Sequence, residues 1–460
     1  MNTDWMVLTP LVPLLAAALA LLVFARRLGG EADRAVPWLS ASALGASLFL
    51  VLAFSTRRLE AFGGLLAFDP LAAGASAVVL AGALAAILLL PAHAQQLRMA
   101  SADFALLVLL ASAGLVVMCS AREWLTAALS LETASLCLYA LAGYDRRRGS
   151  SAEAALKYFL PGAVATGLLL YGAACHYGAT GSTRIGAPGL SGPLGTLSAG
   201  LLLSSLAFKA GLVPFHGWVP DVYAGAPSPA TAFLAASVKA AAFALMARFA
   251  MLGLPGLPAG ASLLVLAALA TMTFANLAGL AQTALKRLLA YSAVAHSGYL
   301  MVGLAGIRPG DSLSPFVYYL ASYALLTVGA FAAASALEDP VTGGLEISRM
   351  RGLARRRPVL SLMLAFCLLG LAGFPPTVGF VAKVGLFSAA WARGLQVLVV
   401  AAVLNSVVAL AYYLKPILAM FLQQAPEGAD LPDPPRWSAA SVLAFLGGAG
   451  GLLMGILPGL

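Results

Sequence analysis

Stretches of about 20 apolar residues recur along the whole 460-residue chain, with short polar joints between them. A helix of that length crosses the hydrocarbon core of a bilayer, which is about 30 Å thick, at about 1.5 Å per residue. We count about 14 such stretches. Since a helix satisfies its backbone hydrogen bonds within one segment, the pattern predicts an all-α polytopic membrane protein with no sizeable domain outside the bilayer.

The composition agrees with this fold class. Hydrophobic residues make up 61% of the chain and charged residues 10%, and the mean hydropathy is +0.93. Soluble domains do not have this composition. The net charge of +9 is spread over the joints without a basic face interleaved with aromatic residues, which excludes nucleic acid as a partner. The lipid bilayer is the predicted environment.

The basic residues of the joints indicate the orientation. Joints after odd-numbered helices carry 16 Lys and Arg residues, whereas the others carry 6. Cytoplasmic joints of membrane proteins are enriched in these cations. The bias predicts that the N-terminus lies outside the cytoplasm, and an even number of helices places the C-terminus on the same side.

The sequence lacks the patterns that hold metals and cofactors. The four cysteines lie in apolar stretches without CxxC spacing, which is typical of buried, reduced thiols. The chain also lacks a Cys/His cluster for zinc, haem or iron–sulfur centres, a P-loop, a dinucleotide-binding glycine motif and HExxH. We therefore expect no metal or cofactor in this chain, and neither redox chemistry nor ATP hydrolysis.

Lysine and arginine are distributed differently. The chain has 21 Arg and 6 Lys, and 20 of the 22 joint cations are Arg. Among the five cations within helices, only Arg248 is an arginine. The other four are Lys157, Lys209, Lys239 and Lys383. A desolvated lysine can release its proton, whereas arginine keeps its proton under all conditions. This preference predicts reversible proton carriers inside the membrane.

A charge at the centre of a bilayer costs about 2.5 to 3.5 kcal/mol, so these lysines need partners or water. Glu132 is the one carboxylate deep within an apolar stretch. One interpretation is a static ion pair that ties two helices together. The other is proton transfer, which the excess of lysines over carboxylates favours because some lysines then spend time neutral.

Two apolar stretches carry helix-breaking residues beside a lysine. Residues 205–221 read SLAFKAGLVPFHGWVPD, and Pro214 has no N–H to donate to the carbonyl of Ala210. Residues 371–387 repeat the arrangement, with Lys383 following the prolines. Each break predicts a hydrated pocket, although a proline kink that only aids packing remains an alternative. Two interrupted helices in corresponding halves are typical of transporters built from inverted repeats.

These motifs resemble a known family. The segment FKAGLVPFHGWVPDVYAGAPSPATAFLAASVKAAAFAL is similar to helices 7 and 8 of the antiporter-like subunits of respiratory complex I, the proton-pumping NADH:quinone oxidoreductase. EAALKYFLPGA, LKRLLAYSAVAHSGYLMVGL and LAGFPPTVGFVAKVGLF resemble its helices 6, 10 and 12. Within the family, VPDVYAGAPSP resembles subunit N rather than L or M. The resemblance covers essentially the whole chain in one order.

The resemblance assigns roles residue by residue. Glu132 and Lys209 match a pair whose separation tunes proton affinity. Lys239 matches the central lysine of helix 8, His296 a histidine on the axis, and Lys383 the lysine of broken helix 12 that faces the exit.

Two further positions match family residues of less defined function. Lys157 matches a lysine of helix 6, and His216 lies in the PFH motif beside the first break as a possible relay group. For both His216 and His296, a hydrogen-bonded structural imidazole is an open alternative, because neutral histidine also satisfies freed carbonyls.

The implied organisation is one antiporter-like domain with discontinuous helices 7 and 12. Its expected parts are helices 1–3 (1–100), two inverted repeats (101–255 and 256–425) and helix 14 (426–460). The resemblance implies a proton-translocating subunit of a bacterial inner-membrane enzyme. Other membrane subunits, including a neighbouring antiporter-like subunit, would be its partners, and subunits elsewhere would hold FMN, iron–sulfur clusters and quinone. The alternative is a subunit of a cation/proton antiporter or membrane-bound hydrogenase with the same fold.

Overall fold

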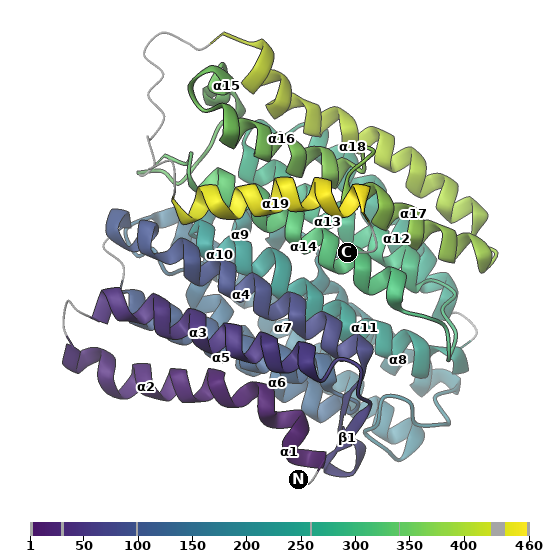
Figure 1. Ribbon diagram of the computed structural model, residues 1–460. Coiled ribbons are helices and arrows are strands. Elements are labelled where there is room, and N and C mark those ends of the chain that lie inside the picture. The colour runs from purple at the N-terminus through teal and green to yellow at the C-terminus, as the bar shows by residue number, and fades with distance from the viewer. Residues whose placement is uncertain are drawn as a thin grey trace.

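The computed structural model describes residues 3–28, 32–97, 100–257, 260–339, 341–424 and 438–457. These residues form a bundle of long helices that run alternately in opposite directions (Figure 1). A short antiparallel hairpin pairs β1 (Leu59–Ala61) with β2 (Leu66–Phe68) at one end of the bundle. Both α1 and the end of α19 lie toward this hairpin end (Figure 1).

Two groups of helices follow one another along the described chain. The first group is α1 (Thr3–Leu8), η1 (Thr9–Leu11), α2 (Val12–Leu28), α3 (Ala32–Ala53), η3 (Phe62–Gly64), α4 (Pro70–Leu97), α5 (Ser101–Ser120), α6 (Trp124–Ala142), α7 (Gly149–Thr180), α8 (Gly192–Ala210), α9 (Trp218–Gly225), α10 (Ser228–Phe233), the π-helical turn η4 (Leu234–Val238), α11 (Lys239–Leu252) and η5 (Leu254–Gly256). The second group is α12 (Gly260–Leu280), α13 (Leu285–Leu304), α14 (Ser314–Ser335), η6 (Ile347–Met350), α15 (Leu353–Arg356), α16 (Pro358–Ala372), α17 (Val378–Ala392), α18 (Gln396–Leu422) and α19 (Ala439–Ile456).

The predicted all-α polytopic fold is confirmed. Within the described ranges, 12 helical segments are long and apolar enough to cross a membrane. The predicted count of about 14 stays a prediction, and α13 together with the shorter pair α16 and α17 are the candidates for the remaining crossings. The predicted boundary at residue 425 lies outside the described residues.

The predicted interruption of helix 7 is present between α8 and α9. The helix ends at Ala210, and Gly211 adopts the left-handed conformation with φ +70°. The backbone N–H of Leu212 donates to the carbonyl of Ala207 at 2.8 Å, which closes the helix end. The side chain of Trp218 donates to the carbonyl of Phe208 at 2.8 Å, and the N–H of Val213 in the unwound segment donates to the hydroxyl of Thr271 at 3.1 Å, so these backbone groups find partners within the protein.

Helix 12 is interrupted in the same way between α16 and α17. Gly373 has φ +82°, and the N–H of Phe374 donates to the carbonyl of Leu369 at 2.9 Å. In both breaks the helix ends before the first proline, and the helix 7 break lies beside Lys209, where the sequence predicted it. A left-handed glycine ends each helix, because glycine adopts positive φ without a steric penalty.

One helical segment lies at the centre of the bundle. Every residue of the most apolar 18-residue stretch of Ser228–Leu252 is buried inside the protein. This segment comprises α10, η4 and α11, and Lys239 begins α11 directly after the π-helical turn. Such turns inside α-helices frequently occur at functional sites. The fold therefore encloses Lys239 in protein on all sides.

Candidate functional site

Lys209 lies in the last turn of α8, within a cage of aromatic rings. Its side chain is 2% exposed, and its ammonium lies 5.0 Å from the ring centre of Tyr139 and 5.2 Å from that of Tyr158. The ammonium donates to the hydroxyl of Ser135 at 2.8 Å and to that of Tyr139 at 3.2 Å. Ring faces and hydroxyl oxygens stabilise the ammonium without a bound carboxylate.

Glu132 lies on α6, one turn before Ser135. Its carboxylate accepts a hydrogen bond from the Thr166 hydroxyl on α7. The Lys209 ammonium on α8 donates to Ser135 rather than to Glu132, so the predicted pair forms no direct ion pair in the described structure. Ser135 and Tyr139 are the groups through which Lys209 meets this helix.

Lys239 connects the two halves of the bundle. Its ammonium donates to the hydroxyl of Ser297 at 2.7 Å and to the carbonyl of Ala293, both on α13. The Ser297 hydroxyl donates in turn to the carbonyl of Ala210 at 2.6 Å, at the end of α8. Ala210 follows Lys209, so a single serine links Lys239 to the first helix break.

His296 is buried beside Lys239 within a group of tyrosines. Its Nδ1 lies 2.8 Å from the hydroxyl of Tyr319, and its Nε2 lies 3.5 Å from that of Tyr413. The His296 ring centre is 5.0 Å from that of Tyr323, whose ring is also 5.3 Å from the Lys239 ammonium. Both ring nitrogens thus meet a hydroxyl that can donate or accept.

Lys383 lies on α17, after the second break. Its ammonium donates to the carbonyl of Ala372 at 2.8 Å, at the end of α16, and to the hydroxyl of Ser406 at 3.2 Å. It also lies 4.7 Å from the ring centre of Tyr299. The Tyr299 ring is 5.7 Å from the His296 ring, so this tyrosine contacts both groups.

The buried groups form one connected line. Its order is Lys209, Ser297, Lys239, Tyr323, His296, Tyr299 and Lys383. Each member contacts the next, except that Ser297 reaches Lys209 only through the backbone carbonyl of the following residue, Ala210. The polar partners of the three lysines in the described structure are hydroxyl and carbonyl oxygens. Hydroxyls can accept from an ammonium and donate to a neutral amine, so the line can accommodate either protonation state.

Comparison with known proteins shows where this arrangement belongs. Residues 121–409 match the model of a family described as NADH:quinone oxidoreductase/Mrp antiporter, transmembrane. This chain belongs to that family. A relative from Herpetosiphon aurantiacus, named NADH-quinone oxidoreductase subunit N 1, is 35% identical over 87% of this chain and 84% of its own length. The predicted resemblance to subunit N is confirmed.

Solved structures agree with the family assignment. A chain of respiratory complex I from Thermus thermophilus is 39% identical, covers 98% of each chain and superposes with a TM-score of 0.85. A chain of the Mrp complex from Dietzia has a TM-score of 0.87 at 23% identity, covers 100% of this chain and 95% of its own, and shows the shared fold alone. The antiporter-like fold of this multi-pass membrane protein is therefore established.

Two of the residues that match family positions, Lys157 and His216, lie away from the line. The side chain of Lys157 is 45% exposed and pairs with Glu153 at 2.6 Å and with Asp221 at 2.8 Å. On α7 it belongs to a charged network at the surface of the chain that also includes Arg287, and its role in proton transfer stays a prediction. His216 is half-buried against the ring of Phe274 on α12, in the unwound segment between α8 and α9.

The uncharged residues that contact the line or belong to it are absent from the sequence-based prediction. Ser135, Ser297, Tyr299 and Tyr323 contact the lysines or His296, yet serine and tyrosine are common in packed helices. A partial signal is the HSGY stretch at 296–299, where His296 and Tyr299 lie one turn apart. The sequence also gives no sign of a second buried charged group, in which His93 contacts Glu338.

Proposed function

We propose that this chain is a proton-translocating membrane subunit of an NADH:quinone oxidoreductase. Protons would move along the line from Lys209 to Lys383 while quinone is reduced in other subunits of the complex. The observation that supports this most directly is the line of buried groups, in which each of the three lysines meets a hydroxyl and an aromatic ring. The names of the relatives supply the electron donor and acceptor.

The proposed cycle begins at Glu132 and Lys209. When the carboxylate approaches, the ammonium of Lys209 is favoured, and when they separate, the desolvated amine is favoured and the proton moves on. The proton then reaches Lys239, which bonds to Ser297 beside the first break, and passes through His296 to Lys383 at the second break. In this proposal, the shift in electrostatic balance comes from the redox reaction in other subunits of the complex.

The orientation is part of the same proposal. The arginine-rich joints 145–148 and 349–357 lie at the cytoplasmic side, and both termini lie outside the cytoplasm of a bacterial cell with this complex in its inner membrane. The two breaks, each a left-handed glycine beside a buried lysine, support a division into two repeats at 101–255 and 256–425.

Substitution of Lys239 by arginine tests the proposal. Arginine keeps the positive charge and can still donate to Ser297, but its proton cannot be released in the working range. We expect assembled complexes with Lys239→Arg to lose at least tenfold in proton pumping. Lys415→Arg is the matched control, because Lys415 on α18 donates to the carbonyl of Leu280 and lies outside the line. Pumping at the wild-type rate by the Lys239→Arg variant would exclude proton transfer at this residue.

A further inference from the structure

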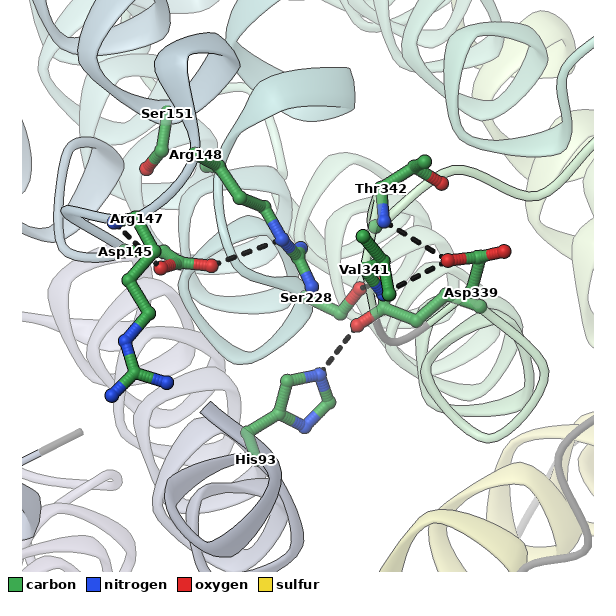
Figure 2. A network of polar contacts seen from close by, with 12 residues as sticks. His93, Asp145, Arg147, Arg148, Ser151, Ser228, Asp339, Val341 and Thr342 are labelled. Carbon is green, nitrogen blue, oxygen red and sulfur yellow. Dashed lines mark hydrogen bonds and ion pairs between the residues drawn. The ribbon is translucent and has the colours of Figure 1, made fainter. Parts of the chain in front are cut away.

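A second group of buried charges lies at the opposite end of the bundle from the hairpin. It joins four elements: His93 near the end of α4, Ser228 at the start of α10, Lys286 at the start of α13 and Glu338 just after α14. All four residues are at most 5% exposed. Figure 2 shows His93 and Ser228 converging on this point beside Arg148. We call these four residues the His93 cluster.

The Glu338 carboxylate is the centre of the His93 cluster. One oxygen lies 2.6 Å from Nε2 of His93, and the other accepts from the hydroxyl of Ser228 at 2.5 Å. The ammonium of Lys286 lies 3.4 Å from the second oxygen and also donates to the carbonyl of Ala226 at 3.1 Å. The carboxylate is thus held from three sides, which fixes its position relative to the imidazole ring.

The hydrogen bond between Nε2 of His93 and the Glu338 carboxylate assigns the tautomer of His93. A carboxylate only accepts hydrogen bonds, so Nε2 of His93 carries the hydrogen and Nδ1 carries the lone pair. Nδ1 is buried and has no partner among the described residues. A buried acceptor of this kind is satisfied by a water molecule or by a proton. The carboxylate on the far side of the ring stabilises the imidazolium that a proton on Nδ1 would form.

The charges around His93 cancel one another while its ring is neutral. Lys286 balances Glu338, and the neighbouring Asp145 pairs with Arg148 at 3.0 Å. With a neutral His93 ring these four charges sum to zero. The guanidinium of Arg148 lies against Gly343, and Asp339 is engaged by Arg349 at 2.8 Å. A proton on His93 therefore adds a single positive charge directly beside a carboxylate.

The position of the cluster connects it to the proposed line. Ser228 begins the central buried segment, and Lys239 follows 11 residues later, about 16 Å along the helix. At the other end of the segment, Arg248 pairs with Asp69 at 2.8 Å and borders a cavity of about 1130 Å³ at the hairpin end. Buried charges thus occur at the start, in the middle and near the end of one helix that other helices enclose.

We propose that His93, oriented by Glu338 and Lys286, is the residue that takes up protons from the aqueous phase at the arginine-rich end of the bundle. This inference rests on the proposed function. A hydronium ion of the aqueous phase transfers its proton to Nδ1 and leaves as water, which gives an imidazolium while Glu338 stays ionised. Release of the same proton toward the interior restores the neutral ring, and Glu338 and Lys286 act as positioning residues.

The substitution His93→Gln separates this role from a structural one. The glutamine amide can donate to Glu338 in place of Nε2, but it does not titrate. We expect normal assembly, at least tenfold slower proton pumping and quinone reduction per complex, and loss of one titration step from the pH profile of the rate. His176→Gln is the matched control, because His176 is also a buried histidine, bonded through Nε2 to the carbonyl of Arg184 at 2.9 Å. Wild-type rates and pH profile in the His93 variant would overturn the proposal.

A second variant covers the case in which His93→Gln does not assemble. The double substitution Lys286→Met and Glu338→Gln removes both charges of the ion pair together, which proteins often tolerate. We expect assembly with at least tenfold slower pumping and a shifted pH profile, because the imidazolium loses its carboxylate; an unchanged profile overturns the proposal. If His93→Gln pumps normally while Lys239→Arg does not, the uptake role fails and the proposed function stands. Normal pumping in both variants would exclude proton transfer at Lys239 as well as uptake at His93.

Discussion

At the scale of single residues, Ser297 is the side chain that connects Lys239 to the first helix break. Its hydroxyl accepts from Lys239 and donates to the carbonyl of Ala210, and no other side chain of the described structure joins these two groups directly. Loss of the hydroxyl leaves a buried carbonyl without its side-chain donor, at a cost of about 1 to 3 kcal/mol. The contact between the first break and Lys239 is lost at the same time.

We therefore expect Ser297→Ala to lower proton pumping per assembled complex at least fivefold. The control is Ser198→Ala, which removes a similar buried bond to the carbonyl of Gly172 at 2.8 Å, away from the line. Pumping assays on reconstituted complexes, normalised to their amount, compare the two variants. Equal pumping by both would show that the serine link is a packing contact.

The carboxylate of Glu338 predicts a dependence of stability on pH. Burial raises the pKa of Glu338, but the charge of Lys286 and the hydrogen bonds from His93 and Ser228 outweigh it and lower the pKa from 4.5 to about 2. A group with a lowered pKa in the folded state stabilises that state above its ordinary pKa and loses this contribution as the pH falls. The contribution is therefore complete above about pH 4.5 and is lost toward pH 2.

We expect the apparent Tm of the purified complex to fall between pH 5 and pH 3, and to fall less in Glu338→Gln. The neighbouring Asp339 also has a pKa lowered to about 2, by the backbone N–H of Thr342 and by Arg349, and it is present in both proteins. The difference between the two Tm curves thus reports Glu338. Parallel curves would contradict the assignment of this carboxylate as ionised.

At the scale of helices, the two breaks share the same backbone arrangement. Gly211 and Gly373 are left-handed, and a Cβ added to either would lie 2.8 Å from a neighbouring side-chain atom, of Val219 and of Lys383 respectively. A residue with a Cβ in the left-handed region costs about 1 to 2 kcal/mol before any steric contact. The breaks thus depend on glycine more than on the prolines that follow.

We expect Gly211→Ala and Gly373→Ala each to lower the apparent Tm of the complex by several degrees and to lower pumping at least threefold. Gly200→Ala is the matched control, because Gly200 lies inside α8 with no atom within 4 Å of an added Cβ. In a helix interior, alanine is favoured over glycine by about 1 kcal/mol. A control that loses as much stability as the two variants would argue against a special role for the breaks.

At the scale of the whole molecule, α6 presents an unusual surface. Leu129 is 72% exposed and Leu136 is 61% exposed, and the partly exposed Glu132 lies between them on the same helix. A charged group facing lipid at the centre of a bilayer costs about 2.5 to 3.5 kcal/mol. Another protein subunit over α6 removes that cost, since it can supply polar partners and exclude lipid from the carboxylate.

We expect the chain to purify within a large membrane complex in which a partner subunit covers α6. A lipid-soluble maleimide should label Leu129→Cys at least fivefold less in the assembled complex than in the isolated chain. Leu266→Cys, on α12 and 64% exposed, provides a comparison site on a different helix. A chain that is stable, active and fully labelled as a monomer would indicate a free-standing transporter instead.

The sequence by itself determined the fold class and the charged members of the line. Apolar stretches of membrane-spanning length leave few alternatives to helices, and the choice of Lys over Arg within them marked Lys209, Lys239 and Lys383. Motif resemblance located both breaks to within a few residues. These features are local in sequence, since each is a property of one helix or of one short motif.

Only the tertiary structure decided which groups contact one another. Lys157 shares its residue type with Lys239, yet α7 turns it toward the surface while the bundle encloses Lys239. Glu338 lies in a joint between apolar stretches, and its burial depends on four elements that converge from distant parts of the chain. The contacts of Ser297 and Tyr323 likewise arise from helix packing, because a hydroxyl gains a partner only when another helix brings one within hydrogen-bond distance.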